Sequence, residues 1–414
     1  MTKYRKCSLV RRLLAMCLVL TFLSGCASKA DQSQPAAEGT ESYVPADTAP
    51  HKLGVSVYNT QNDEVQGFRS YLEDYIAANF EMVSFVYSGS ISSKEEDLDF
   101  IRKACDDGVE GFLSFLSHDL EAEVALCEER GAYYLLASGT VSSEAFEAVE
   151  DNPWFLGIFG PGKPFEFEAG ADMARYFIRE KTGNRYFIMS GGAAVGNEMH
   201  YQRTLGMLDT IANAYGVSFS LPREEMAASE DPVTEQNERV TVTVCPGYVR
   251  FPESLEIIRQ SFTGGEYDAV MSVLAPDDAV DFIGKTPLGI VDSYNTRNLQ
   301  LFASGPLCFV EGKYNSMIGP AFALMLNAVT GYAEDFRDDG KAIAVTQGFW
   351  VAEGREDYNE KYALSTSAAM NAYNFDDLAA VIRIYNPEAN LNDLCALAEA
   401  CSYRAVQARR SRDQ

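Results

Sequence analysis

A repeated alternation of a short apolar run with an amphipathic helix most restricts what this chain can fold into. Residues 53–57 form a β-rich apolar run, and apolar residues then recur at helical spacing as far as Phe80. Similar runs begin at Met82 and Gly111, so two successive spacings are 29 residues, about the length of one strand–helix unit. This rhythm predicts an α/β fold in which right-handed helical crossovers join parallel strands.

The alternation comes in two halves, followed by a segment of a different kind. Residues 160–164 hold four Gly or Pro in five, which is typical of a hinge or boundary, and strands and helices then alternate again. Two predicted helices, at 375–385 and 391–408, lie beyond the last strand. We therefore expect two lobes, each with a parallel sheet flanked by helices, and a helical extension over 362–414 packed on one of them.

Residues 1–25 predict a targeting segment. Five basic residues precede the apolar run from Leu13 to Leu23, which is too short to span a bilayer comfortably. The sequence Leu23-Ser24-Gly25-Cys26 then resembles the cleavage box of bacterial lipoproteins, in which the cysteine becomes the acylated first residue. Ordinary signal cleavage with an incidental cysteine is the alternative. Two or more acyl chains on Cys26, such as palmitate, would anchor the protein stably at the extracytoplasmic face of the cell membrane.

Residues 26–51 are rich in Ala, Ser, Gln, Pro, Glu and Thr, and we expect them to form a flexible tether. The formal net charge of the chain is −26, and residues 1–25 carry five basic and no acidic side chains, so the remainder stands at −31. Such an acidic body is poorly suited to bind nucleic acid, although solubility alone also explains the charge. The basic residues near the C-terminus predict a frayed, solvated tail; they are Arg404, Arg409, Arg410 and Arg412.

Six cysteines follow Cys26, and their spacing argues against a disulfide framework. No two of them show CxxC spacing, and most lie within apolar helix or strand patterns. We interpret them as buried thiols, with disulfides as the alternative. They are Cys105, Cys127, Cys245, Cys308, Cys395 and Cys401.

Sequence signatures of enzymes and of metal or nucleotide sites are absent or incomplete. Gly284-Lys285-Thr286 has the end of a phosphate-binding loop, but Ala279 stands where the first glycine is required. A calcium-loop-like stretch at 335–340 has Arg337 at a ligand position. No HExxH, GxSxG or convincing nucleophile–base pairing occurs. The sequence therefore predicts a protein that is not an enzyme, with no catalytic residue, metal or cofactor.

The loop at residues 58–63 is the first candidate for a binding site. It follows a predicted strand and carries an aromatic ring and amides in Tyr58, Asn59 and Gln61. Open parallel sheets collect ligands at the carboxyl ends of their strands. We therefore expect a small polar molecule to bind at this loop.

Three short patterns, taken in order, resemble a known family. LGVSVYN begins at Leu53, Arg203-Thr204-Leu205-Gly206-Met207 follows the sixth predicted strand, and Met317-Ile318-Gly319-Pro320-Ala321 precedes a helix. With the lipoprotein-like signal and the two α/β halves, they resemble the type I periplasmic-binding-protein fold. The likeness is particularly to the sugar-type substrate-binding lipoproteins of ABC importers, and it covers about residues 52–350.

The resemblance implies how the chain is divided between the lobes. A hinged fold of this kind crosses between its lobes three times, which we expect near 159–162, 305–313 and 340–342. The implied segments are 52–160 and 313–340 for the N-terminal lobe, and 161–312 and 341–361 for the C-terminal lobe.

The resemblance also implies a ligand held between the lobes at the strand ends. Carried over by position, the implied site residues are Tyr58, Asn59, Gln61, Ser138, Arg203, Asp277, Asp292, Tyr294 and Glu311, with Lys313 as the alternative to Glu311. Carboxylates and a guanidinium make charge-assisted hydrogen bonds to hydroxyls, and Tyr58 or Tyr294 could cover a ring face. These residue types suit a polyol.

Several of these residues have competing structural roles. Asp277 is equally suited to cap the helix that follows it, Arg203 to form a structural ion pair, and Tyr58 to pack at the hinge. Ser138-Gly139 and Pro276-Asp277 depart from the Asp-Arg and Asn-Asp pairs of many sugar-binding members. A nucleoside, a signalling furanone or another polar metabolite therefore stays open beside a sugar.

The leading hypothesis is a monomeric, extracytoplasmic solute-binding lipoprotein that captures a small polar ligand and delivers it to an ABC permease in the membrane. A binding module of a sensor kinase or chemoreceptor would use the same pocket. An envelope hydrolase is the third hypothesis. A DNA-binding regulator of the same fold is disfavoured by the signal and by the lack of a preceding helix-turn-helix pattern.

Overall fold

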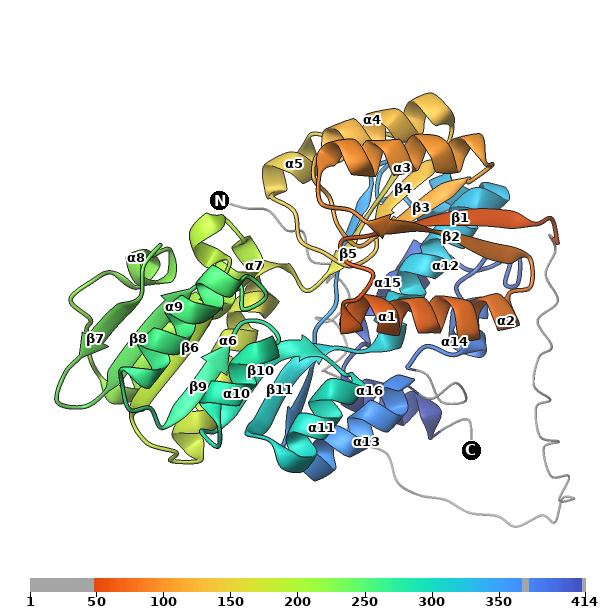
Figure 1. The fold of residues 1–414 in the computed structure, drawn as a ribbon. Coiled ribbons are helices and arrows are strands. Elements are labelled where there is room, and N and C mark those ends of the chain that lie inside the picture. Colours follow the sequence, from red (N-terminus) through yellow and green to blue (C-terminus); the bar gives the residue numbers. More distant parts are fainter. Residues whose placement is uncertain (1–47, 367–371, 412–414) are drawn as a thin grey trace, which may run out of the picture.

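The computed structural model describes residues 48–366 and 372–411. The predicted signal, most of the tether, Cys26 and Arg412 lie outside these residues. Figure 1 shows two α/β lobes: lobe 1 begins with the red and orange elements, and lobe 2 is mostly green. The predicted α/β class with two lobes is confirmed.

Lobe 1 is built on a six-stranded sheet in which every pairing is parallel. The strand order is β12-β5-β4-β3-β1-β2. The strands are β1 (His51–Val57), β2 (Val83–Ser90), β3 (Gly111–Ser114), β4 (Tyr133–Leu136), β5 (Phe155–Gly160) and β12 (Ile343–Thr346). Leu53 and Val55 of β1 are fully buried, as a strand covered on both faces requires.

Helices lie on both faces of this sheet (Figure 1). The first helical segment starts at Asn62, whose Oδ1 accepts hydrogen bonds from the backbone N–H groups of Glu64 (2.9 Å) and Val65 (3.3 Å), a helix N-cap. The elements are α1 (Asp63–Ser70), η1 (Tyr71–Ile76), α2 (Ala77–Asn79), α3 (Lys94–Asp106), α4 (Leu120–Arg130), α5 (Ser143–Glu147), η4 (Asn315–Ile318), α12 (Gly319–Asn327), η5 (Ala328–Tyr332) and η6 (Ala333–Phe336).

Lobe 2 contains a seven-stranded mixed sheet with the order β13-β11-β10-β9-β6-β8-β7. Its five central strands are parallel, whereas β7 and β13 at the edges run antiparallel to their neighbours. The expected parallel sheet is therefore corrected at both edges. The strands are β6 (Arg185–Gly191), β7 (Val233–Gln236), β8 (Thr241–Pro246), β9 (Ala269–Ser272), β10 (Leu288–Ser293), β11 (Leu307–Lys313) and β13 (Trp350–Glu353).

Two long helices of lobe 2 pack unusually close to each other. A Cβ added at Gly170 would lie 1.8 Å from the carbonyl oxygen of Arg203, and one added at Gly206 would lie 1.9 Å from that of Phe167. Glycine is therefore required on both helices, and the close approach fixes the position of Arg203. The helices are α6 (Gly162–Arg179), η2 (Ala193–Val195), α7 (Glu198–Tyr215), α8 (Arg223–Ala227), α9 (Pro252–Thr263), η3 (Asp277–Ala279), α10 (Val280–Ile283), α11 (Thr296–Ser304) and α13 (Arg355–Thr366).

The chain crosses between the lobes after β5, after β11 and between β12 and β13. The first crossing falls at the expected residues 159–162, and the second follows Lys313, at the end of the expected range 305–313, because 307–313 form a strand of the lobe 2 sheet. The third crossing lies later than expected, because β12 pairs with β5 of lobe 1 from Ile343↔Gly157 to Thr346↔Gly160. Residues 343–346 thus belong to lobe 1, and the third crossing follows Thr346 instead of lying at 340–342. Ile343 and Val345 are buried at this edge of the sheet. Burial of their apolar side chains stabilises β12 in the sheet of lobe 1.

Over the described residues 372–411, the C-terminal extension is helical, as predicted, with three short helices where two were expected. They are α14 (Phe375–Ala379), α15 (Leu391–Glu399) and α16 (Tyr403–Arg410). Leu394 and Val406 of the extension are fully buried in the same core cluster as residues of both lobes. The extension is therefore part of the folded body.

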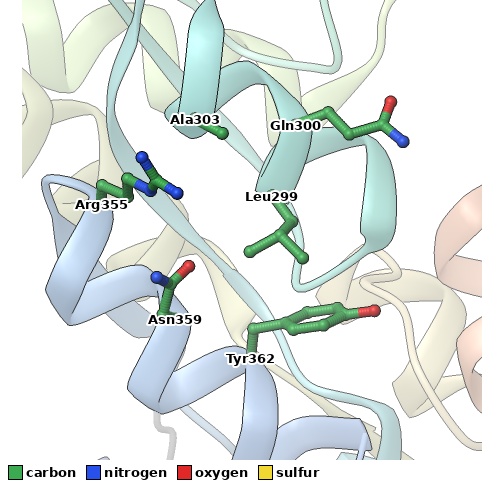
Figure 2. Close-up of a pocket in the computed structure, with 6 residues that line it drawn as sticks. All are labelled: Leu299, Gln300, Ala303, Arg355, Asn359 and Tyr362. Atoms are coloured by element: carbon green, nitrogen blue, oxygen red, sulfur yellow. The ribbon is translucent and has the colours of Figure 1, made fainter.

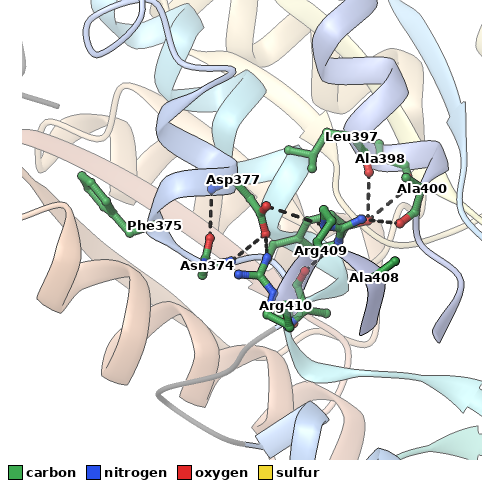
Figure 3. Close-up of polar contacts among 12 residues, drawn as sticks. Asn374, Phe375, Asp377, Leu397, Ala398, Ala400, Ala408, Arg409 and Arg410 are labelled. Carbon is green, nitrogen blue, oxygen red and sulfur yellow. Dashed lines mark hydrogen bonds and ion pairs between the residues drawn. The ribbon is translucent and has the colours of Figure 1, made fainter. Parts of the chain in front are cut away.

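The prediction of a frayed basic tail is wrong for Arg409 and Arg410. Both pair with Asp377 of α14, and Arg409 also donates to the carbonyl oxygens of Ala400 (2.6 Å) and Ala372 (2.8 Å). Figure 3 shows the two guanidinium groups converging on the Asp377 carboxylate. The cluster thus ties α16 back to α14.

Two other expectations concern the same described residues. Cys127, Cys245 and Cys401 are buried thiols, in agreement with the interpretation made from their spacing, whereas Cys105 and Cys308 are free thiols that are only partly buried. Within residues 48–366 and 372–411, no helix has the length and apolar character needed to cross a membrane, and no cluster of metal-ligating side chains is found.

Candidate ligand site between the lobes

A buried ion pair joins the two lobes where α1 meets the carboxyl ends of β10 and β11. The Nζ of Lys313, the last residue of β11, lies 3.1 Å from Oε1 of Glu64 in the first turn of α1. Only 9% of the lysine side chain and 16% of the glutamate side chain are exposed. Because unpairing a buried charge is costly, this contact holds a lobe 1 helix against the end of a lobe 2 strand.

Asp292 lies at the end of β10, beside this ion pair. Its Oδ2 accepts hydrogen bonds from Nδ2 of Asn298 (2.6 Å) and of Asn295 (3.1 Å) at the start of α11. Burial raises the pKa of the Asp292 carboxyl to about 7; the hydrogen bond from Asn298 lowers it, and the charge of Glu64 raises it further. Near neutral pH this carboxyl can therefore accept a hydrogen bond or, when protonated, donate one.

Tyr58, at the end of β1, faces the same region from lobe 1. Its hydroxyl donates to Oδ1 of Asn62 at 3.0 Å. Burial raises the pKa of this phenol well above its usual value, the charges of Glu64 and Asp292 raise it further, and that of Arg250 lowers it. Groups of both lobes thus act on one another here, with Tyr58 and Glu64 on one side and Asp292 and Arg250 on the other.

Arg250 belongs to a loop that the sequence analysis did not select. It follows β8, and its guanidinium carbon lies 5.1 Å from the ring centroid of Tyr248 and 5.0 Å from that of Phe251. Phe251 is 48% exposed. The rule that selected residues 58–63, that ligands bind at the carboxyl ends of parallel strands, could also have found this loop. In both places, polar and aromatic side chains follow a predicted strand.

Arg203 forms a second buried ion pair, which lies within lobe 2. Its Nε lies 2.5 Å from Oε2 of Glu166 on α6, and its Nη1 donates to the carbonyl oxygen of Val273 at 2.7 Å. The Glu311 carboxyl on β11 lies nearby, and its pKa is raised well above the usual value by burial and by Asp172, against a lowering effect of Arg203. The geometry supports the competing role of Arg203 as a structural ion-pair partner.

Buried hydroxyl groups lie at the carboxyl ends of strands in both lobes. Ser138 and Thr140 follow β4 of lobe 1, and Ser190 lies near the end of β6 in lobe 2. Their hydroxyl oxygens have no hydrogen-bond partner among the described residues. Buried polar atoms normally have partners, so Ser138 keeps its place as a candidate ligand contact.

Three of the expected site residues have other surroundings. Tyr294 is 1% exposed and stacks on Tyr358 at 5.1 Å, with its ring packed against Trp350. This packing favours a core role for the Tyr294 ring, and its expected contact with a ligand stays a prediction. Oδ1 of Asn59 accepts from the backbone N–H of Gln61 at 2.9 Å, a local turn contact, and Gln61 is exposed.

The side chain of Asp277 lies outside the described part of the structure, so its expected capping and binding roles stay predictions.

The pockets that the surface offers elsewhere do not coincide with this region. One of about 490 Å³ lies between α11 and α13 and is lined by Leu299, Gln300, Ala303, Arg355, Asn359 and Tyr362 (Figure 2). Another, of about 570 Å³, lies where the tether joins the body and includes Pro50, Met82, Phe375 and Tyr385. Neither is lined by a residue expected from the sequence, so the convergent polar groups define the candidate site.

Two α/β lobes with three crossings, and polar groups gathered at the strand ends between them, make up the type I periplasmic-binding-protein fold. Solved structures with this fold show how general the likeness is. An arabinose-binding protein from Geobacillus stearothermophilus matches with a TM-score of 0.55 and 13% identity, covering 76% of this chain and 100% of that chain. A sugar ABC transport substrate-binding protein from Bordetella parapertussis matches with a TM-score of 0.54 and 14% identity, covering 77% and 94%.

A third match is an ABC transporter solute-binding protein from Bacillus halodurans with bound myo-inositol. Its TM-score is 0.52 at 16% identity, and the alignment covers 77% of this chain and 99% of that chain. No protein-family model and no curated protein matches this sequence. At such identities the likeness establishes the fold, and these structural neighbours are binding proteins rather than enzymes.

Proposed function

We propose that this protein is an extracytoplasmic solute-binding lipoprotein that captures a small polar ligand, a sugar or a related polyol, between its lobes. The observation that carries the proposal is the meeting of polar groups from both lobes at the strand ends: Tyr58 and Glu64 face Asp292, Lys313 and Arg250. Solved proteins of the same fold are described as sugar-binding or inositol-bound, which supports the ligand class.

The chemistry of the site matches a ligand with several hydroxyl groups. Asp292 has a pKa of about 7, so near neutral pH it can accept from one hydroxyl or donate to another. Arg250 offers fixed donors beside two aromatic rings, and hydrogen bonds to charged groups are the stronger ones. The unpartnered hydroxyl of Ser138 would gain a partner from the ligand.

Closure of the two lobes over the ligand follows if the ligand binds the closed arrangement more tightly than the open one. We propose that the closed form is recognised by an ABC permease, and that the protein acts as a monomer held by a lipid on Cys26. Replacing the lipid-bearing residue, Cys26→Ser, should move the protein from the membrane fraction to the soluble fraction. Retention in the membrane fraction would contradict the anchor.

A thermal-shift screen followed by calorimetry tests the binding proposal. The mature chain with Cys26→Ser is screened against arabinose, galactose, myo-inositol and nucleosides. A ligand at 100 times its Kd should stabilise the folded state by about 2.7 kcal/mol, and Asp292→Ala should abolish the shift. Glu266→Ala, which changes an exposed carboxylate of lobe 2, serves as the control. If the protein converts one of these compounds to a product and binds none of them stoichiometrically, the proposal is wrong.

A further inference from the structure

The described part of the C-terminal extension, residues 372–411, is anchored on lobe 1 by hydrogen bonds between lobe 1 side chains and backbone groups of the extension. The Tyr71 hydroxyl donates to the carbonyl oxygen of Tyr373 at 2.7 Å, and the Phe375 N–H donates to the hydroxyl of Tyr75 at 2.9 Å. On α12, the fully buried Asn327 side chain donates to the carbonyl oxygen of Val381 at 2.9 Å. These contacts make the first part of the extension move with lobe 1.

Further along, one residue of the extension binds two of the three crossing segments. The carbonyl oxygen of Cys401 accepts from Nε1 of Trp350 (2.8 Å) and from the hydroxyl of Tyr314 (3.3 Å), and its Sγ accepts from the Gly348 N–H (3.2 Å). Tyr314 follows β11, and Gly348 leads into β13. The rings of Tyr314 and Trp350 stack with centroids 3.9 Å apart, so the two crossings are held together at this point.

The last helix then reaches lobe 2. Oε1 of Glu360 on α13 accepts from the Tyr403 hydroxyl (2.6 Å) and from Nε2 of Gln407 (2.9 Å). The Nζ of Lys361 lies 5.0 Å from the centroid of the Tyr403 ring, and that ring lies 5.3 Å from Trp350. In Figure 1, α16 lies beside α13 at the base of the molecule.

Helix α16 is also fixed to the part of the extension that lobe 1 holds. Arg409 and Arg410 pair with Asp377 of α14 (Figure 3), and the Arg409 guanidinium lies 5.1 Å from the ring centroid of Tyr373. A continuous set of contacts therefore runs from α12 of lobe 1, past the crossings, to α13 of lobe 2.

We propose that residues 372–411 act as a strap that sets the angle between the two lobes. A rotation of lobe 2 about the crossings changes the distance between Glu360 and Tyr403 and disturbs the contacts of Cys401. The strap therefore narrows the range of lobe angles in the free protein. Under the proposed function, a membrane partner recognises one arrangement of the lobes. The strap would then limit how far the lobe angle of the free protein differs from the angle in the recognised form.

The test uses the full mature chain and needs no ligand. Tyr403→Ala removes the contacts with Glu360, Lys361 and Trp350, and Glu360→Gln is a milder second variant. Arg404→Ala, an exposed residue of the same helix, is the control. Small-angle scattering should fit one lobe arrangement for the parent and for Arg404→Ala, and a wider spread of lobe angles for Tyr403→Ala.

Hydrogen exchange gives the second readout. The amides of Gln347 and Gly348, in the third crossing, should exchange at least tenfold faster in Tyr403→Ala, and faster by a smaller factor in Glu360→Gln. Unchanged scattering and unchanged exchange at these amides in both variants would overturn the strap. The strap would also be overturned if amide exchange became faster to the same extent throughout the chain, in the crossing segments and in the cores of the lobes alike. If no ligand is ever found to bind, the proposed function fails while the strap stands or falls on these measurements.

Discussion

The two buried ion pairs, Glu64–Lys313 and Glu166–Arg203, look alike in composition and differ in what they connect. The first joins helix α1 of lobe 1 to the end of a lobe 2 strand, and the second joins two helices of lobe 2. Both bury their basic partner to a similar degree, with side chains 9% exposed. Residue type and burial therefore do not distinguish an ion pair between the lobes from one within a lobe. The two kinds of pair are distinguished by the helices and strands on which their residues lie.

The internal pair is specified locally, and the pair between the lobes is not. Gly206 stands three residues after Arg203 and allows the close approach of α6 that brings Glu166 into reach. In contrast, Glu64 and Lys313 are 249 residues apart and meet only because the chain returns to lobe 1 after β11. Four variants, taken from the largest expected effect to the smallest, test these two pairs and two other buried polar groups.

Arg203→Met should cause the largest loss of stability. It leaves the Glu166 carboxylate, which is fully buried, without its cation, and breaking one partner out of a buried pair costs about 3–5 kcal/mol. Urea unfolding of the variant measures the loss. The matched control is Arg175→Met, whose ion pairs are exposed and should contribute less than about 1 kcal/mol. Equal losses in both variants would contradict the structural role of the internal pair.

Asp97 is a buried acidic residue whose neighbour is another acidic residue, Glu123, and not a basic one as in the two ion pairs. It is fully buried, and burial together with Glu123 raises its pKa from 3.8 to about 7. Between these pH values the unfolded chain ionises while the folded one does not, so stability falls as pH rises from about 4 to 7. The fall is about 1.4 kcal/mol per pH unit.

Unfolding of Asp97→Asn measured across this pH range checks the effect. Asp292 has a similar pKa and contributes over the same interval, so Asp97→Asn should flatten the profile in part, and the double variant with Asp292→Asn should flatten it further. A profile identical to that of the parent would show that the Asp97 carboxyl is ionised in the folded state. Charge without a partner would then be tolerated in the core of lobe 1.

Lys313→Met should cost less than Arg203→Met, because the Glu64 side chain keeps 16% exposure to water. Leaving a polar group unsatisfied costs about 1–3 kcal/mol when it is fully buried, and a charged group costs more; because water reaches Glu64, we expect a loss of about 1–3 kcal/mol. A double-mutant cycle with Glu64→Gln isolates the pair and should give a coupling of about 0.5–3 kcal/mol. The exposed pair Lys94–Asp119 is the control and should couple by less than about 1 kcal/mol. A coupling free energy of zero between Glu64 and Lys313 would contradict a stabilising contact between the lobes at this pair.

Tyr294→Phe should have the smallest effect. The Tyr294 hydroxyl is buried and has no hydrogen-bond partner among the described residues, so removing it should change stability by less than about 1 kcal/mol, in either direction. Tyr134→Phe is the matched control, since the Tyr134 hydroxyl donates to Oε2 of Glu123 at 2.8 Å and its loss should cost about 1–3 kcal/mol. A large loss for Tyr294→Phe would mean that the hydroxyl has a partner after all.

Much of the fold could be predicted because its signals are periodic and local. The 29-residue rhythm and the apolar face from Val65 to Phe80 correspond to buried side chains on β1, α1 and η1. The strand β7 could not be predicted, and neither could the lobe that holds β12, because each strand has four residues and is placed in its sheet by its pairing partner. The same reason explains Arg409 and Arg410, whose carboxylate partner lies more than thirty residues earlier, in α14.

The candidate site was predicted in part, through the rule that ligands gather at strand ends. That rule selected the loop that contains Tyr58, whereas Asp292 was carried over by position from the family resemblance; both lie close enough to Glu64 for its charge to affect their pKa values. The resemblance also implied Tyr294, because position along a strand does not tell how a ring is packed. It missed Glu64, which lies on a helix, and Arg250, which lies on a loop that carried no family pattern.

The central claim is that a single ligand is held by polar groups of both lobes. Its most direct test is calorimetric titration of a ligand found by the thermal-shift screen into Glu64→Gln and Asp292→Asn, with Glu266→Gln, an exposed carboxylate of lobe 2, as the control. We predict that each of the first two changes weakens binding by at least tenfold and that the control binds like the parent. Binding that is weakened by the change in one lobe and untouched by the change in the other would contradict a ligand held between them.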